Sequence, residues 1–168
     1  DQFKKETGIA NPEITITTTS NYLSFCEYIQ REIQKTGLNV KVDVIPAATL
    51  KDAKANGKLD MFRASWVADY PDAENYLSLY YSKNFAPNGP NYTHFKDEQF
   101  DLWYEEAYTI TNTEKREQLY SKMDSLVMQK TPVIVMFYDE VLRFTRKNVS
   151  GLGINPINLL DLKRVKKN

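Results

Sequence analysis

The feature that most constrains the fold is a strand–helix–strand pattern in the first third of the chain. Residues 14–18 and 40–44 are rich in β-branched side chains and alternate in character, as strands do. Between them, apolar residues recur at three- and four-residue spacings over 22–33, which indicates a helix that ends near Gly37. Two strands joined by such a helix pair in parallel, with a right-handed crossover. We therefore predict an α/β fold with a mixed central sheet flanked by helices.

The rest of the chain continues this alternation. Two pairs of polar residues mark helix starts, because Ser20 with Asn21 suits an N-cap and Thr111 with Glu114 has capping-box spacing. The run 59–66 indicates a third strand. The other predicted elements are helices at 49–55, 73–81, 100–107 and 119–127, a loop at 83–93, a buried strand at 132–138, and its neighbour at 141–145 after a tight turn at Asp139 and Glu140.

Composition limits the classes of partner. A chain of 168 residues with 42% hydrophobic residues fits one compact domain, and 22 Lys and Arg balance 22 Asp and Glu, so we expect no nucleic-acid partner. The longest apolar runs fall well short of the roughly 20 residues that cross a bilayer. The lone Cys26 is expected to fill the core. Because Asp1 is not a natural start, we expect the chain to come from a longer or processed product.

The sequence offers little for catalysis. It contains one histidine, His94, and one cysteine far from it, which makes a Ser-His-Asp or Cys-His site a poor hypothesis. Metal-ligand spacings and glycine-rich phosphate loops do not occur. We therefore expect no cofactor, no bound metal and no enzyme activity.

The candidate site is the segment 66–72, at the carboxyl end of the third predicted strand, where open α/β sheets collect ligands. The carboxylate of Asp69, walled by Trp66 and Tyr70, suits an ammonium group because the rings exclude water from a charge-assisted hydrogen bond. Two other interpretations stay open. Trp66 could belong to the core while Asp69 caps the next helix, or Asp69 and Asp72 could form the carboxylate pair of a hydrolase.

A longer stretch around this segment resembles a known family. Residues 59–72, LDMFRASWVADYPD, with Asn75, are similar to the signature of the family 5 bacterial solute-binding proteins, the oligopeptide and dipeptide receptors of ABC importers. The resemblance covers nearly the whole chain from about Ile14. It continues through Asn91-Tyr92, Phe95, Phe100-Asp101, the helix with Arg116, Leu119 and Tyr120, and the run 132–138.

The resemblance implies a class II periplasmic-binding-protein-like lobe, one of two that close over a ligand. Residues 14–148 would form the C-terminal ligand-binding lobe after a leading segment at 1–13. Residues 149–168 would return toward an N-terminal lobe outside this chain. The implied protein is a monomer that works with an ABC transporter permease, in the periplasm or another extracytoplasmic space, free or lipid-anchored.

The resemblance also assigns roles to individual residues. Asp69 would pair with the α-ammonium of a peptide, and Trp66 would line a side-chain pocket. Arg63 matches a position that can meet the peptide carboxylate, and Tyr138 falls in an aromatic strand that approaches the ligand. We expect the site on a face formed by Arg63, Trp66 and Asp69. The same fold could instead bind an oligosaccharide or a metal chelate, because fold does not determine ligand.

Overall fold

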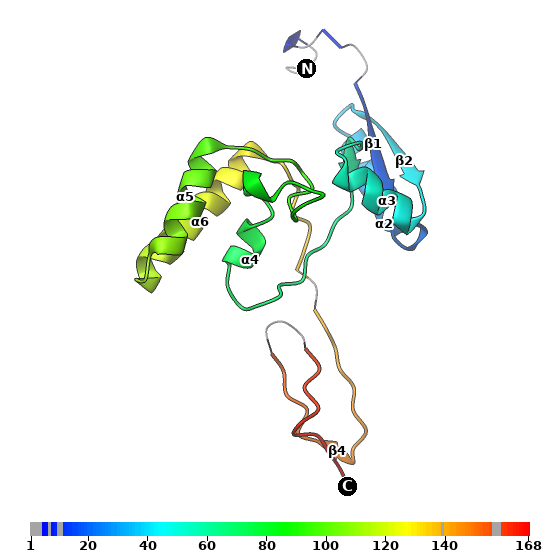
Figure 1. The fold of residues 1–168 in the computed structure, drawn as a ribbon. Helices are drawn as coiled ribbons and strands as arrows, with labels where there is room; N and C mark the ends of the chain where they lie inside the picture. Colours follow the sequence, from blue (N-terminus) through cyan, green and yellow to red (C-terminus); the bar gives the residue numbers. More distant parts are fainter. Residues whose placement is uncertain (1–4, 7, 10–11, 139, 156–158) are drawn as a thin grey trace. The chain divides into compact units, whose positions relative to one another are not determined.

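The structure is a computed structural model, shown in Figure 1, that describes residues 5–6, 8–9, 12–138, 140–155 and 159–168. The leading segment expected at 1–13 lies largely outside the described residues. Contacts within the chain divide it into two compact units. The first comprises Asp1–Ser65 and Leu79–Asp97, and the second comprises Trp66–Ser78 and Glu98–Asn168.

The first unit is built on the predicted strand–helix–strand pattern. Strands β1 and β2 pair in parallel, with Ile16 opposite Val42, and β1 also pairs in parallel with β3, giving the order β2-β1-β3. The parallel β1–α2–β2 arrangement expected from the sequence is therefore confirmed. The elements of this unit are β1 (Glu13–Thr18), η1 (Ser20–Tyr22), α2 (Leu23–Gln34), β2 (Asn39–Val44), α3 (Ala47–Ala55), β3 (Met61–Phe62) and η2 (Ser82–Asn84).

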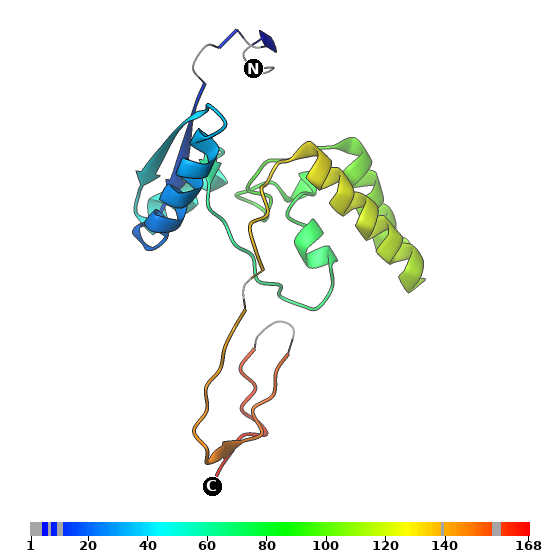
Figure 2. The same ribbon diagram turned by 180° about the vertical axis from the view of Figure 1, so that it is seen from behind.

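The core of the first unit lies between α2 and the sheet. Ile16, Cys26 and Val40 are buried, and Cys26 fills the core as predicted. The helix α2 lies along the β1–β2 pair, as Figure 2 shows from behind. Partly buried hydrophobic residues complete this core: Phe25, Ile29, Ile33, Leu38, Val42 and Met61.

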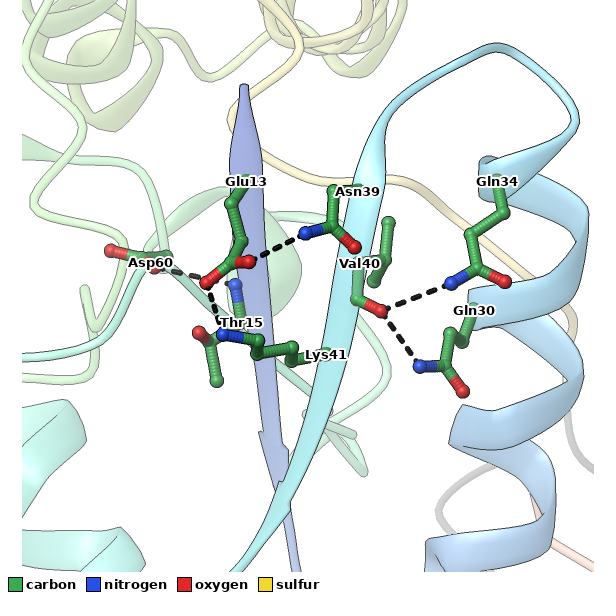
Figure 3. A network of polar contacts seen from close by, with 8 residues as sticks. All are labelled: Glu13, Thr15, Gln30, Gln34, Asn39, Val40, Lys41 and Asp60. Carbon is green, nitrogen blue, oxygen red and sulfur yellow. Dashed lines mark hydrogen bonds and ion pairs between the residues drawn. The ribbon is translucent and has the colours of Figure 1, made fainter. Parts of the chain in front are cut away.

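Side chains of α2 also protect an edge of this sheet (Figure 3). In the described residues β2 is an edge strand, and the carbonyl oxygen of Val40 accepts hydrogen bonds from Gln30 at 2.7 Å and from Gln34 at 3.2 Å. Glu13 pairs across the two strands with the ammonium of Lys41 at 2.7 Å. The two glutamine contacts satisfy a carbonyl group that an exposed strand edge would otherwise offer to another chain.

Two local predictions in this unit were wrong in detail. Ser20 and Asn21 do not cap α2 but form a 3-10 turn with Tyr22, whose backbone nitrogen donates to the carbonyl of Thr19 at 3.0 Å. A backbone bond therefore takes the place of a side-chain cap. The third strand, expected over 59–66, is confined to Met61–Phe62, and the chain leaves the sheet before the candidate site.

The second unit contains the helix pair predicted from the sequence. Helices α5 and α6 lie side by side (Figure 1) and bury the expected stripes, Phe100, Tyr104 and Ala107 on one and Leu119, Met123 and Val127 on the other. The elements are α4 (Glu74–Leu77), α5 (Glu98–Thr109), α6 (Thr113–Lys130), β4 (Val149–Ser150) and β5 (Lys166–Lys167), the last two antiparallel. None of the helices in the described residues is both long and apolar enough to cross a membrane.

The ends of two helices differ from the prediction. Asn112, not Thr111, caps α6, because its side-chain oxygen accepts a hydrogen bond from the backbone nitrogen of Lys115 at 3.0 Å. Helix α4 covers four residues where a helix over 73–81 was expected. The segment that precedes α4 folds back onto this short helix through side-chain contacts with Glu74 and Asn75.

The buried strands expected at 132–138 and 141–145 are not found. None of the described residues from 132 to 145 belongs to a strand, and Ile134, Tyr138 and Phe144 are 62%, 89% and 92% exposed. Asp139, part of the expected tight turn, lies outside the described residues. An apolar run becomes a buried strand only when a neighbouring strand pairs with it, and the described part of this chain supplies no such neighbour.

Candidate functional site

The candidate site is a loop that follows β3 and folds back onto α4. One atom organises it, the side-chain oxygen of Asn75. This oxygen accepts a hydrogen bond from the indole nitrogen of Trp66 at 2.7 Å and a second from the backbone nitrogen of Asp69 at 3.2 Å. Asn75 is buried, whereas Asp69 is exposed. The loop therefore presents the Asp69 carboxylate to solvent from a backbone held at a defined position.

Tyr70 is held by Glu74, the residue of α4 that precedes Asn75. Its hydroxyl donates to the carboxylate of Glu74, which also accepts from the hydroxyls of Tyr104 and Tyr108, the latter at 2.8 Å. Glu74 is only 8% exposed, so tyrosine hydroxyls take the place of water around its charge. The hydrogen bond to Glu74 raises the pKa of Tyr70, and burial raises the pKa of Tyr104 and of Tyr108. The Tyr70 hydroxyl is thus directed to Glu74, while the residue as a whole stays 43% exposed.

Both carboxylate oxygens of Asp72 are engaged by contacts within the second unit. One carboxylate oxygen accepts from the backbone nitrogen of Glu74 at 2.9 Å, and the other lies 3.4 Å from the guanidinium of Arg116 on α6. Burial, followed by the negative charge of Asp72, raises the pKa of Tyr120 to about 12. Asp72, not Asp69, therefore supports the start of α4, which removes the main argument for Asp69 as a structural cap.

Arg63 lies in the first unit, directly after β3. Its guanidinium carbon is 3.7 Å from the centre of the Tyr22 ring, and one of its nitrogens donates to the Ser65 hydroxyl at 3.1 Å. A second cation, Lys54, was not singled out in the sequence. Its ammonium lies 5.1 Å from the centre of the Tyr92 ring, and burial, followed by the charge of Arg63, lowers its pKa. Two neighbouring cations suit an anionic ligand group, which would relieve their mutual repulsion.

The first unit also has an open hollow of about 440 Å³ at the carboxyl ends of β1 and β2. Its position agrees with the rule for ligand sites on parallel sheets. The sequence predicts a site only after the third strand, because the residues that line this hollow form no motif. They are Thr19, Ser20, Asn21, Val44, Ile45, Pro46 and Ala47.

The comparison with protein families decides the class of this protein. The model of the bacterial extracellular solute-binding proteins, family 5 Middle, matches residues 2–88, which is more than half of the 168 residues. The chain belongs to this family. The resemblance inferred from the residues around Trp66 and Asp69 is confirmed.

Two curated relatives align with most of this solute-binding chain. Di/tripeptide-binding protein 4 of Pseudomonas aeruginosa is 24% identical over 161 residues, which cover 92% of the chain and 30% of the relative. The probable deoxycholate-binding periplasmic protein YgiS of Escherichia coli is 28% identical over 119 residues, which cover 71% of the chain and 22% of that protein. The chain therefore spans less than a third of the length of either relative.

Solved structures share the fold. The periplasmic binding protein DppA of Helicobacter pylori, determined in complex with the peptide STSA, superposes with a TM-score of 0.69 at 27% identity. The superposition covers 78% of the solute-binding chain and 26% of the DppA chain. This likeness confirms the predicted α/β, periplasmic-binding-protein-like fold.

Only three of the five predicted site residues of this family 5 chain come together. Trp66, Asp69 and Tyr70 come together in the second unit, where each is tied to α4. Arg63 belongs to the first unit, and Tyr138 is almost fully exposed in the segment 132–145. The expectation that Arg63 and Tyr138 face the same ligand as Asp69 stays a prediction.

The histidine of this solute-binding chain has a structural setting. His94 adopts a positive φ of 51°, its Nε2 lies 3.2 Å from the carbonyl oxygen of Ala86, and its ring meets Phe85 edge-on. Gly57 has a positive φ of 61°, and a Cβ atom there would lie 3.3 Å from the His94 ring, so a larger residue at this position would be strained. Within the described ranges, no three His, Cys, Asp or Glu side chains gather as metal ligands would.

Proposed function

We propose that this chain is the C-terminal ligand-binding lobe of a peptide receptor that serves an ABC importer. The observation that carries the proposal is the setting of Asp69, an exposed carboxylate on a loop whose backbone is held by Asn75, next to the half-buried ring of Trp66. A carboxylate on a held backbone, with an aromatic ring tied to the same amide oxygen, suits the α-ammonium of a peptide. Membership of family 5 and relatives named as di/tripeptide-binding proteins support it.

In the first unit, Arg63 and Lys54 offer two neighbouring positive charges, and aromatic rings hold both side chains in place. We propose these two cations as the partners of an anionic ligand group. A receptor that fixes charged termini and leaves side chains in roomy pockets accepts many sequences.

The role is binding without turnover. Asp72, the second carboxylate that a hydrolase would need, is engaged by the backbone of Glu74 and by Arg116. A different ligand on the same fold is the stronger rival, because the relative YgiS is named for deoxycholate, and an oligosaccharide or a metal chelate could use the same architecture. The negative charge of Asp69 favours a cationic ligand group over these rivals.

The exposed segment 132–145 supports the wider arrangement. Its large apolar side chains are exposed, which is unusual for a stable monomer surface. We propose that it packs against the remainder of a longer receptor, and that residues 149–168 lead toward an N-terminal lobe. Such a receptor would act outside the cytoplasm and deliver its ligand to a permease.

The test uses the full-length protein that carries this chain. Calorimetry with a panel of di- to pentapeptides, a glycoside panel and bile acids should give saturable binding for peptides, and mass spectrometry should recover each ligand unchanged. Cleavage of a peptide or glycoside would refute the receptor role. Binding only to bile acids or glycosides would keep the receptor role but reject peptides as its ligands.

A further inference from the structure

Asn75 joins the two parts of the candidate site through one oxygen atom. We propose that Asn75 is the positioning residue that sets the receptor's preference for a free ammonium group. It would do so by holding the backbone of Asp69 and the indole of Trp66 at a defined distance from each other. It would not touch the ligand itself. The inference rests on the proposed function, because it concerns the same site.

The hydrogen bonds of Asn75 fit this role. Its side-chain oxygen has two lone pairs, and each has a donor, the Trp66 indole at 2.7 Å and the Asp69 backbone at 3.2 Å. The residue is 3% exposed, so water cannot readily replace either bond. The two donors lie six and nine residues before Asn75 in the chain. One buried amide therefore closes the loop and sets the spacing between the carboxylate and the aromatic wall.

This closure bears on affinity through preorganisation. An exposed carboxylate on a free loop must lose backbone freedom when it binds an ammonium, and that loss weakens binding. A hydrogen bond to the Asp69 backbone removes part of that freedom before the ligand arrives. The gain should appear only for ligands that use the Asp69 carboxylate.

The backbone of Asn75 is anchored independently of its side chain. Its nitrogen donates to the carbonyl of Asp72 at 3.1 Å, and its carbonyl accepts from the Ser78 hydroxyl at 2.8 Å. Replacing the side chain therefore leaves these two contacts in place. Asn75→Leu has nearly the same size but cannot accept a hydrogen bond. Asn75→Ser is the second variant, since its hydroxyl is too short to reach both donors.

The experiment compares a free-amine dipeptide with its N-acetylated form, by calorimetry on the full-length protein. We expect Asn75→Leu to weaken the free-amine peptide about tenfold or more, and the N-acetylated peptide at most twofold. In an Asp69→Asn background the same substitution should change neither affinity by more than about twofold. If Asn75→Leu does not fold, Asn75→Ser replaces it, and the same changes in affinity are expected.

A spectroscopic readout separates positioning from general stability. The indole N–H resonance that disappears in Trp66→Phe should move upfield in Asn75→Leu while the protein stays folded. Equal weakening of both peptides, or equal weakening with and without Asp69, would overturn the inference. So would an unmoved indole resonance.

The failure of the proposed function looks different. If the unsubstituted receptor shows no preference for the free amine, the proposed role of Asp69 fails, and the inference about Asn75 fails with it. If that preference exists and survives in Asn75→Leu, only the inference about Asn75 is wrong.

Discussion

The hydroxyl of Tyr108 lies 2.8 Å from a carboxylate oxygen of Glu74. Through this contact, α5 supports α4, and α4 supports the loop that carries the candidate anchor Asp69. The candidate site is thus attached to the helix pair of the second unit.

Asp69 is expected to be the ammonium anchor. Asp69→Asn in the full-length receptor should weaken the binding of a free-amine peptide by about 2 kcal/mol or more. The reason is that the ligand's ammonium group would lose the carboxylate with which it forms a charge pair. Calorimetry measures the change, with an N-acetylated peptide as the comparison ligand. Asp124→Asn, on an exposed position of α6, is the matched control and should bind normally. Equal losses for the two peptides would show that Asp69 is structural.

Glu74 is expected to be a stability residue. Glu74→Gln removes the negative charge and replaces one acceptor oxygen with an amide NH2 group, so at least one tyrosine hydroxyl can no longer donate to a carboxylate. The free energy of unfolding should fall by about 1–3 kcal/mol, as measured by denaturant titration. Glu117→Gln, at an exposed position of α6, should change it by less than about 0.5 kcal/mol. An unchanged free energy of unfolding in Glu74→Gln would mean that the Glu74 carboxylate does not stabilise the fold.

Tyr120 is expected to make the fold sensitive to alkali. Its folded pKa of about 12 exceeds the ordinary value of 10.0, so the folded state binds the proton more tightly than the unfolded state. The stabilisation is complete below pH 10 and is lost as the pH rises from 10 through 12. Denaturant titrations across this range should show falling stability, and Tyr120→Phe should make the fall shallower. An unchanged slope in Tyr120→Phe would reject this assignment.

Asn112 is expected to stabilise the start of α6 as its N-cap, and Thr111 is not. Asn112→Ala removes the oxygen that accepts from the Lys115 backbone, which should cost about 1 kcal/mol of stability. Thr111→Ala should have no comparable effect, although the sequence alone favoured Thr111 as the cap. Thermal unfolding of the two variants distinguishes the assignments directly. A larger loss of stability in Thr111→Ala than in Asn112→Ala would instead support the capping box of Thr111 and Glu114.

The 168-residue chain by itself is expected to bind peptide weakly or undetectably. A receptor lobe without its partner leaves the ligand in contact with water and forfeits the buried area that drives affinity. The exposed apolar segment 132–145 should at the same time bind an apolar fluorescent dye, whereas the full-length receptor should bind much less. Tight peptide binding by this chain alone would contradict the two-lobed mechanism.

Local periodicity accounts for the parts of the fold that were predicted correctly. The alternation at 14–18 and 40–44 and the helical spacing at 22–33 involve neighbours in sequence, and β1, β2 and α2 formed as expected. The same holds for the stripes of α5 and α6. The run 132–138 has an equally clear apolar pattern, but a strand also needs a distant partner, and no pattern within the run reveals whether one is present.

The sequence by itself determined the family, the α/β class and the position of Trp66 and Asp69, because an ordered motif is a property of the chain. Only the tertiary structure decided how that motif is held. It showed that Asn75 binds Trp66 and Asp69 with one oxygen, that Asp72 supports α4, and that Lys54 lies near Arg63. Hydrogen bonds and electrostatic interactions depend on distance and direction in space, which the turns between β3 and α4 set and which spacing in sequence does not reveal.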